Sequence, residues 1–279
     1  MTRTKMFFAF FLAALLAVPS LSFAADKKMP AQGEIANMIR VSLVDFSDAV
    51  KSGDTKPVLS KCTKEFQLIF TEKIYKILMH QFIEKKITFY QVKDVPLFYM
   101  SAPYFDNFGD LMIKGFFIQD KSEDNLVTFE LSYHWADSSW LMNSFGFRTF
   151  PKKGLPSGEQ LKELVSTDVI LFNDALKSGD FSKFREALTK SMKEGSTPET
   201  LKQNFSALNN NKKYAQNVAA DKIYFEDYPD LIGSEYLIVK VRYPLDGNQA
   251  GFVAMSFSFK KEEGKWKIGD VRAGVQTGG

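Results

Sequence analysis

Cysteine is almost absent from this sequence, and histidine is nearly as rare. Among 279 residues the only cysteine is Cys62 and the only histidines are His80 and His134. A single cysteine cannot form an internal disulfide, so a disulfide-stapled scaffold is excluded. Two isolated histidines without a cysteine cluster also argue against a transition-metal site, and we expect no bound metal.

Long apolar runs are missing beyond the first residues of the chain. The stretch Met6 to Val18 follows the cations Arg3 and Lys5 and precedes Ser22-Phe23-Ala24, a small-x-small pattern typical of a cleavage site. About 13 apolar residues fall short of the roughly 20 that span a bilayer. The sequence therefore predicts a signal peptide over residues 1–24, cleavage near Ala24, and a soluble periplasmic or secreted protein without stable membrane insertion.

Clustered charge and nucleotide-binding loops are lacking as well. The chain has 36 basic and 33 acidic residues, and loss of residues 1–24 would leave 34 and 33, a net charge of +1. Lys and Arg alternate with acids along the chain, which argues against a nucleic-acid partner. No Gly-rich phosphate loop or nucleophile elbow is present, so we expect no cofactor. Cys62 follows the apolar Val58 and Leu59, which favours a buried thiol.

What the sequence does contain is an internal repeat at an offset of 126 residues. The segment from Asp45 to Asp54, DFSDAVKSGD, matches LFNDALKSGD from Leu171 to Asp180. The same offset carries Thr63 onto Thr189, Pro103 onto Pro229, Lys114 onto Lys240 and Trp140 onto Trp266. A register kept without a gap over such a distance indicates duplication of a whole domain. We predict a first domain over 30–150, a linker over 151–157 and a second domain over 158–275.

Each copy is expected to place helices before strands. Apolar residues at helical spacing open both copies, and Gly53 and Gly179 follow as helix-ending glycines. Thr197-Pro198 is typical of a helix start, and a third helix should follow it. In the first copy the corresponding helix holds the apolar residues Ile74, Ile77, Leu78 and Phe82. Later segments alternate apolar and polar residues, as in 127–135 and 253–260, which predicts antiparallel strands and an α+β fold in each copy.

The order of elements resembles the nuclear transport factor 2-like superfamily. The resemblance is carried by DAVKSGD at residues 48–54 with Trp140-Leu141-Met142, and by DALKSGD at 174–180 with Trp266-Lys267-Ile268. It implies two tandem cone-shaped domains, each with about three helices on a curved antiparallel sheet. The superfamily includes ketosteroid-isomerase-like enzymes and domains that only bind or associate, so the resemblance does not select an activity.

Aromatic residues are the most prominent candidates for a ligand site. The chain has 27 Phe, 10 Tyr and 3 Trp, and some of them cluster around Pro103 and Pro229. Such rings suit the mouth of a cavity for an apolar ligand, although a small domain also needs large side chains simply to fill its core. The candidate ligand-binding residues are Tyr99, Tyr104, Phe105, Tyr224 and Tyr228.

Acid–base chemistry has a single weak candidate set, His134, Glu130 and Tyr99. His134 and Glu130 share a strand face, but residues four apart on a strand lie about 13 Å apart, too far for direct contact. The sequence favours an exported, non-catalytic binding or interaction module that is monomeric, with its two copies paired as a pseudo-dimer. Its expected partner is a small apolar molecule or an envelope protein. The alternative is an isomerase- or dehydratase-type enzyme with one active cone in the first domain.

Overall fold

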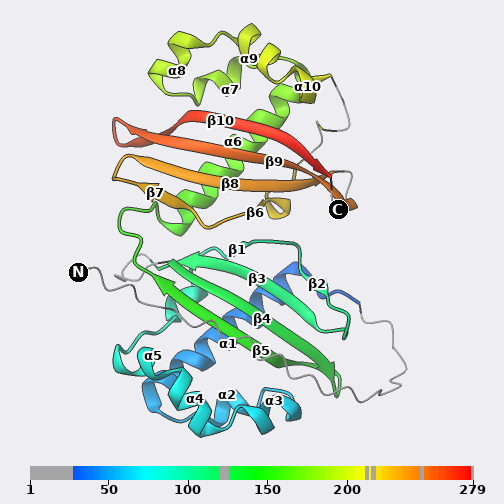
Figure 1. Ribbon diagram of the computed structural model, residues 1–279, viewed down its shortest axis with the longest axis vertical. Helices are drawn as coiled ribbons and strands as arrows, with labels where there is room; N and C mark the ends of the chain where they lie inside the picture. The colour runs from blue at the N-terminus through cyan, green and yellow to red at the C-terminus, as the bar shows by residue number, and fades with distance from the viewer. Residues whose placement is uncertain (1–27, 120–125, 211–213, 215–217, 246–247, 278–279) are drawn as a thin grey trace, which may run out of the picture.

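The computed structural model describes residues 28–119, 126–210, 214, 218–245 and 248–277 (Figure 1). The predicted signal peptide, residues 1–24, lies outside these residues. Within the described residues no helix is both long enough and apolar enough to cross a membrane. The architecture is α+β, with helices followed by an antiparallel sheet in each half of the chain.

The first half begins with one long helix and several short ones. Its helices are α1 (Gln32–Ser52), α2 (Lys56–Leu59), α3 (Lys64–Ile69), α4 (Glu72–Leu78), α5 (His80–Glu84) and the 3-10 turn η1 (Tyr90–Lys93). Its strands are β1 (Phe98–Tyr99), β2 (Tyr104–Phe105), β3 (Leu111–Ile118), β4 (Leu126–Ala136) and β5 (Ser139–Phe150). The sheet has the order β1-β3-β4-β5, and β2 also pairs with β3.

The second half repeats this order. Its helices are α6 (Gly158–Ser178), α7 (Ser182–Glu186), α8 (Lys190–Gly195), α9 (Pro198–Asn204), α10 (Ser206–Asn209) and η3 (Ala220–Lys222). Its strands are β6 (Tyr224–Phe225), β7 (Asp230–Ile232), β8 (Tyr236–Leu245), β9 (Asn248–Glu262) and β10 (Lys265–Thr277), in the order β10-β9-β8-β6 with β7 beside β8. The bounds of α6, α8 and α9 are those of α1, α3 and α4 shifted by 126, so the repeat in the sequence is also a repeat in the structure.

Local signals at the helix ends act as the sequence predicts. Gly53 and Gly179 end α1 and α6 with φ of 75° and 70°, a left-handed conformation that glycine adopts without a Cβ penalty. Thr197 caps α9 by accepting a hydrogen bond from the Thr200 amide, and Pro198 occupies the first turn. These features stop or start the helices at matching places in the two halves.

The long helices lie across one face of each sheet. Ser42 of α1 and the Tyr133 hydroxyl of β4 are 2.8 Å apart, and Asn173 of α6 accepts a hydrogen bond from Tyr243 of β8. Buried apolar side chains fill the space between helix and sheet in both halves. Cys62 is part of the first core at 2% exposure, as expected, and burial raises the pKa of its thiol to about 12.

The two halves meet where the short strands β1 and β6 come together (Figure 1). Phe116 of β3 is fully buried there, with its ring stacked on Phe98 at 4.9 Å and edge-on to Phe225 at 5.0 Å. Phe98, Phe116, Ile118 and Leu126 of the first half belong to the core cluster of the second half. The junction is therefore an apolar continuation of the second core.

The predicted third helix is divided in both halves, and the second half has α9 and α10 where one helix is expected. Two short helices, α4 and α5, replace a single helix, and Ile74 and Ile77 are 38% and 64% exposed. The residues that face the core are Tyr75, Met79 and Phe82. Several apolar positions occur in this segment, and only packing decides which of them turn inward.

Candidate functional site

The aromatic residues predicted to bind a ligand fall into two groups. Tyr99 on β1 and Tyr224 on β6 lie on neighbouring strands at the junction of the halves, and Tyr228 packs edge-on to Phe116 at 5.8 Å. Phe105 and Tyr104 lie on β2, where Phe105 stacks on Trp140 at 6.1 Å and Tyr104 is 49% exposed. Of the three tyrosines at the junction, Tyr228 has ring contacts that join the two halves, with Phe116 and Phe150 of the first half.

Burial raises the pKa of the two junction tyrosines Tyr99 and Tyr224. Burial is the largest effect on Tyr99, and although the charge of Arg40 acts in the opposite direction, the pKa of Tyr99 rises to about 12. Burial also raises the pKa of Tyr224. Both hydroxyls are therefore protonated near neutral pH, where they can donate a hydrogen bond but cannot act as bases.

The three residues of the predicted acid–base set do not form one site. Glu130 pairs with Lys114 at 4.0 Å, whereas Nδ1 of His134 lies 2.6 Å from a carboxylate oxygen of Asp110. Tyr99 is on β1, separated from β4 by β3. The partner of His134 is thus Asp110, which sequence reasoning missed because the two residues are 24 positions apart and meet only through strand pairing.

Asp110 is the buried member of a chain of hydrogen bonds. It is 6% exposed, and its second carboxylate oxygen accepts a hydrogen bond from the Asn143 side-chain amide at 2.5 Å. The Asn143 carbonyl in turn accepts a hydrogen bond from Thr63, which also caps the N-terminus of α3. A carboxylate held in this way can fix the orientation and tautomer of His134, whose side chain is 41% exposed.

This chain of hydrogen bonds points away from α1. The neighbouring residues Tyr133 and Leu111 both face the first core, and successive residues of a strand point to opposite faces. His134 and Asp110 therefore lie on the sheet face opposite α1, rather than between helix and sheet. At the offset of 126 the second half has Lys260 and Tyr236 in place of His134 and Asp110, so the pair occurs once.

The second half has a buried acid of its own, Asp168 on the inward face of α6. Its counterpart is Ser42, which lies beside the Tyr133 hydroxyl in the first half. The second half has Phe259 at the position of Tyr133, so that hydroxyl is missing there. Asp168 is only 6% exposed, and burial raises its pKa to about 7 against the smaller opposing effect of Lys267.

An exposed apolar surface lies on α3 and α4, at the end of the first half remote from the junction (Figure 1). We define the α3–α4 surface as four apolar residues and two lysines: Leu68, Ile69, Ile74, Ile77, Lys73 and Lys76. Leu68 is 80% exposed and Ile77 is 64% exposed. Ile69 and Ile74 are 41% and 38% exposed, so two successive helices each present exposed aliphatic side chains, a feature typical of interaction sites.

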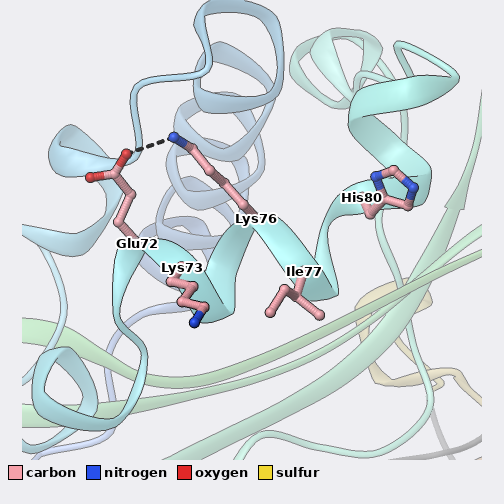
Figure 2. A pocket seen from close by; sticks show the side chains of 5 residues that line it. All are labelled: Glu72, Lys73, Lys76, Ile77 and His80. Carbon is pink, nitrogen blue, oxygen red and sulfur yellow. Dashed lines mark hydrogen bonds and ion pairs between the residues drawn. The ribbon is translucent and has the colours of Figure 1, made fainter.

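A shallow hollow of about 690 Å³ borders this surface. It is lined by Glu72, Lys73, Lys76, Ile77 and His80. Figure 2 shows these side chains along α4 and the start of α5, with Glu72 joined to Lys76 in an ion pair of 2.7 Å. His80 pairs with Glu84 at 3.1 Å and lies at the surface. The hollow is open to solvent, so it does not resemble an enclosed site for an apolar ligand.

The second half acts as an internal control for the α3–α4 surface. Inward positions are apolar in both halves: Tyr75 and Leu201, Met79 and Phe205, Phe82 and Leu208. The four exposed apolar positions, by contrast, become Glu194, Gly195, Thr200 and Gln203 at the same offset. The shared fold therefore does not require apolar residues at these places, and comparison of the two copies would have found the signal in the sequence.

No protein family model matches this chain, and no curated protein matches it. Within the described part of the chain, no group of three or more His, Cys, Asp or Glu side chains is placed to hold a metal ion. Two features of the described residues point to function: the α3–α4 surface and the His134–Asp110 pair.

Proposed function

We propose that the protein is an exported, non-catalytic interaction module that docks on the cell envelope through its α3–α4 surface. The observation that carries the proposal is the exposure of Leu68, Ile69, Ile74 and Ile77 in the first copy and their replacement by polar residues or glycine in the second. Full burial of an exposed aliphatic side chain contributes about 1.5–3 kcal/mol, and the contribution is smaller for Ile69 and Ile74, which are 41% and 38% exposed. An occupant that covers them would recover part of that free energy.

We also propose that each half is a nuclear transport factor 2-like domain, over residues 30–150 and 158–275. The matching element bounds support two copies of one domain, as do the β-bulges between Ser132/Tyr133 and between Ile268/Asp270, which lie at corresponding places. The superfamily itself is proposed from the order of helices and strands and from the repeated sequence motifs. In this view duplication supplied two copies of one scaffold, of which the first kept or acquired a docking surface. The second half contributes Phe225 and its core to the junction, where Phe98 and Phe116 of the first half pack.

The docking proposal predicts that the envelope retains less protein when exposed apolar residues of the α3–α4 surface are replaced by the residues that occupy the same positions in the second half. In the variant Leu68→Glu/Ile74→Thr/Ile77→Gln, each residue is replaced by its counterpart in the second half. We expect washed envelope fractions to retain the wild-type protein and at least about tenfold less of the triple variant, because the variant buries less apolar surface on docking.

The matched control is Ile232→Gln, which removes an apolar side chain of 54% exposure from β7 in the second half. This variant should be retained like the wild type. Equal retention of the triple variant and the wild type would contradict docking through the α3–α4 surface. Urea unfolding of each variant confirms that exposed substitutions leave the fold intact.

The His134–Asp110 pair supports a second candidate function, proton transfer by an isomerase- or dehydratase-type enzyme. A buried carboxylate 2.6 Å from Nδ1 leaves Nε2 as the group that could accept a substrate proton. The pair is present in the first half only, so the fold that the two halves share does not require it. It lies on the outer face of the sheet, which distinguishes this proposal from an active site enclosed between helix and sheet.

This second proposal predicts a catalysed exchange reaction. The wild type should accelerate exchange of the α-protons of an apolar ketone with deuterium oxide, followed by NMR, and His134→Gln should lower that rate by about 100-fold or more, since general bases contribute effects of this size. The other histidine supplies the control, because His80→Gln should exchange at the wild-type rate. Equal rates for the wild type and His134→Gln would remove proton transfer as a function.

A further inference from the structure

The α3–α4 surface combines protruding aliphatic side chains with an excess of lysine. Residues 61–86 contain six lysines and three glutamates, whereas the chain from residue 25 onward carries a net charge of only +1. Two of these lysines have acidic partners, Lys61 with Asp45 and Lys76 with Glu72, and the exposed Lys73 lies on α4 beside Glu72. Lys64, Lys73 and Lys76 are exposed on the same two helices that present Leu68 and Ile77. Positive charge and apolar side chains thus occupy one end of the molecule, which calls for an occupant that is anionic at its surface and apolar beneath.

The residue types favour a lipid surface over a protein partner. Hot spots of protein interfaces are enriched in Trp, Tyr and Arg, and lysine is depleted there. Residues 61–86 contain no Trp and no Arg, and their one tyrosine, Tyr75, is fully buried. Surfaces that lie on a bilayer instead combine Leu-type side chains with Lys, so that aliphatic groups enter the acyl boundary while ammonium groups contact the headgroups.

The shape of the surface agrees with this occupant. Leu68 is 80% exposed near the end of α3, and Ile77 is 64% exposed near the end of α4, so both side chains project from the surface. The hollow beside Ile77 is open to solvent and does not enclose a partner side chain (Figure 2). Projecting side chains suit a soft surface that they can enter, whereas a rigid partner would need a matching cavity.

From these observations we propose that the α3–α4 surface binds the headgroup region of an anionic lipid bilayer, with Leu68, Ile69 and Ile77 inserted and Lys73 and Lys76 at the phosphates. This inference rests on the proposed docking function and names its occupant. The binding is peripheral and reversible, because a few side chains enter the interface and no segment spans the bilayer. It also depends on salt, since screening weakens attraction between lysines and anionic headgroups.

The test is flotation of purified protein with vesicles. The chain from residue 25 onward is used, so that the apolar stretch at residues 6–18 cannot bind lipid by itself. We expect binding to vesicles of mixed phosphatidylglycerol and phosphatidylcholine, weaker binding as salt rises, and little binding to phosphatidylcholine alone. Two variants introduce the residues found at the same positions in the second half: Leu68→Glu/Ile77→Gln and Lys73→Glu. Each variant should bind the charged vesicles at least about tenfold more weakly than the wild type.

Ile232→Gln is again the matched control and should bind vesicles like the wild type. Equal binding to charged and uncharged vesicles would overturn the inference, as would wild-type binding by Leu68→Glu/Ile77→Gln. Absence of vesicle binding, together with envelope retention that still depends on the α3–α4 surface, would replace the lipid by an envelope protein and leave the docking function standing. Loss of both results would refute docking itself.

Discussion

Gly115→Ala should destabilise the protein by about 3 kcal/mol or more. A Cβ atom at this position on β3 would overlap the backbone oxygen of Phe98 and lie 2.7 Å from a ring carbon of Phe129. Backbone atoms cannot move aside as a flexible side chain can, so β1 would have to separate from β3. Urea unfolding, read as the free energy of unfolding, measures the loss.

The same substitution also tests how the two halves are joined. β1 carries Phe98, whose ring stacks on Phe116 and contacts Phe225 of the second half, so displacement of β1 should weaken the junction. The matching residue of the second half is Val241, where Met255 replaces Phe129. Glycine is therefore required by the close approach of β1 and the Phe129 ring in the first half, and not by the fold that the two halves share.

Gly146→Ala is the matched control for Gly115→Ala. Gly146 lies in the same sheet, on β5, but a Cβ atom there would meet only the Glu130 carbonyl oxygen, at 3.9 Å. We expect this variant to be at least as stable as the wild type, because alanine loses less backbone entropy on folding than glycine. If both variants unfolded at the same urea concentration, the steric explanation would be wrong.

Replacement of Asp168 by asparagine should remove a pH dependence of stability. Burial raises the pKa of this carboxyl from 3.8 to about 7 in the folded chain. Below pH 3.8 the carboxyl is protonated in both the folded and the unfolded chain, so it does not lower the free energy of unfolding. As pH rises, the unfolded chain releases the proton first, so the folded state loses relative stability until the folded pKa near 7 is passed.

The size of this effect follows from the shift. Three pKa units correspond to about 4 kcal/mol in full, of which about 2–3 kcal/mol should develop between roughly pH 5 and pH 8. Over that interval the free energy of unfolding of the wild type should fall by this amount relative to Asp168→Asn. Urea unfolding at a series of pH values gives both curves.

An exposed acid on the same helix supplies the control for Asp168→Asn. Asp174 lies two turns further along α6 with its side chain in solvent. If Asp174→Asn altered the pH profile as much as Asp168→Asn, or if neither altered it, the cost would not come from the buried carboxyl. A change confined to Asp168→Asn would identify the second core as the origin of the pH dependence.

Local sequence patterns predict much of the fold. Helical spacing of apolar residues, glycines that end α1 and α6, and alternation along β4 and β9 each depend on residues close together in the chain. Such short-range signals need no knowledge of tertiary contacts. The offset of 126 adds a long-range signal, because one copy can be compared with the other residue by residue.

The candidate site is less accessible to this kind of reasoning. His134 is one of only two histidines in the sequence, which makes it a candidate site residue. Its partner Asp110 becomes evident only when β3 and β4 pair in a particular register. Asn143 joins them because a bulge in β5 adds one residue between Ser144 and Met142. Neither the register nor the bulge has a strong sequence signal, since both depend on how whole strands fit one another.

The sequence by itself determined the α+β order, the helix ends and the duplication, because these are written in local periodicity and in a repeated register. Only the tertiary structure decided that Ile74 and Ile77 face solvent, that Asp168 is buried, and that the aromatic side chains of β1 and β6 form the junction between the halves. Exposure is a property of what packs against a residue. That neighbour is set by contacts between segments far apart in the chain, which no local pattern records.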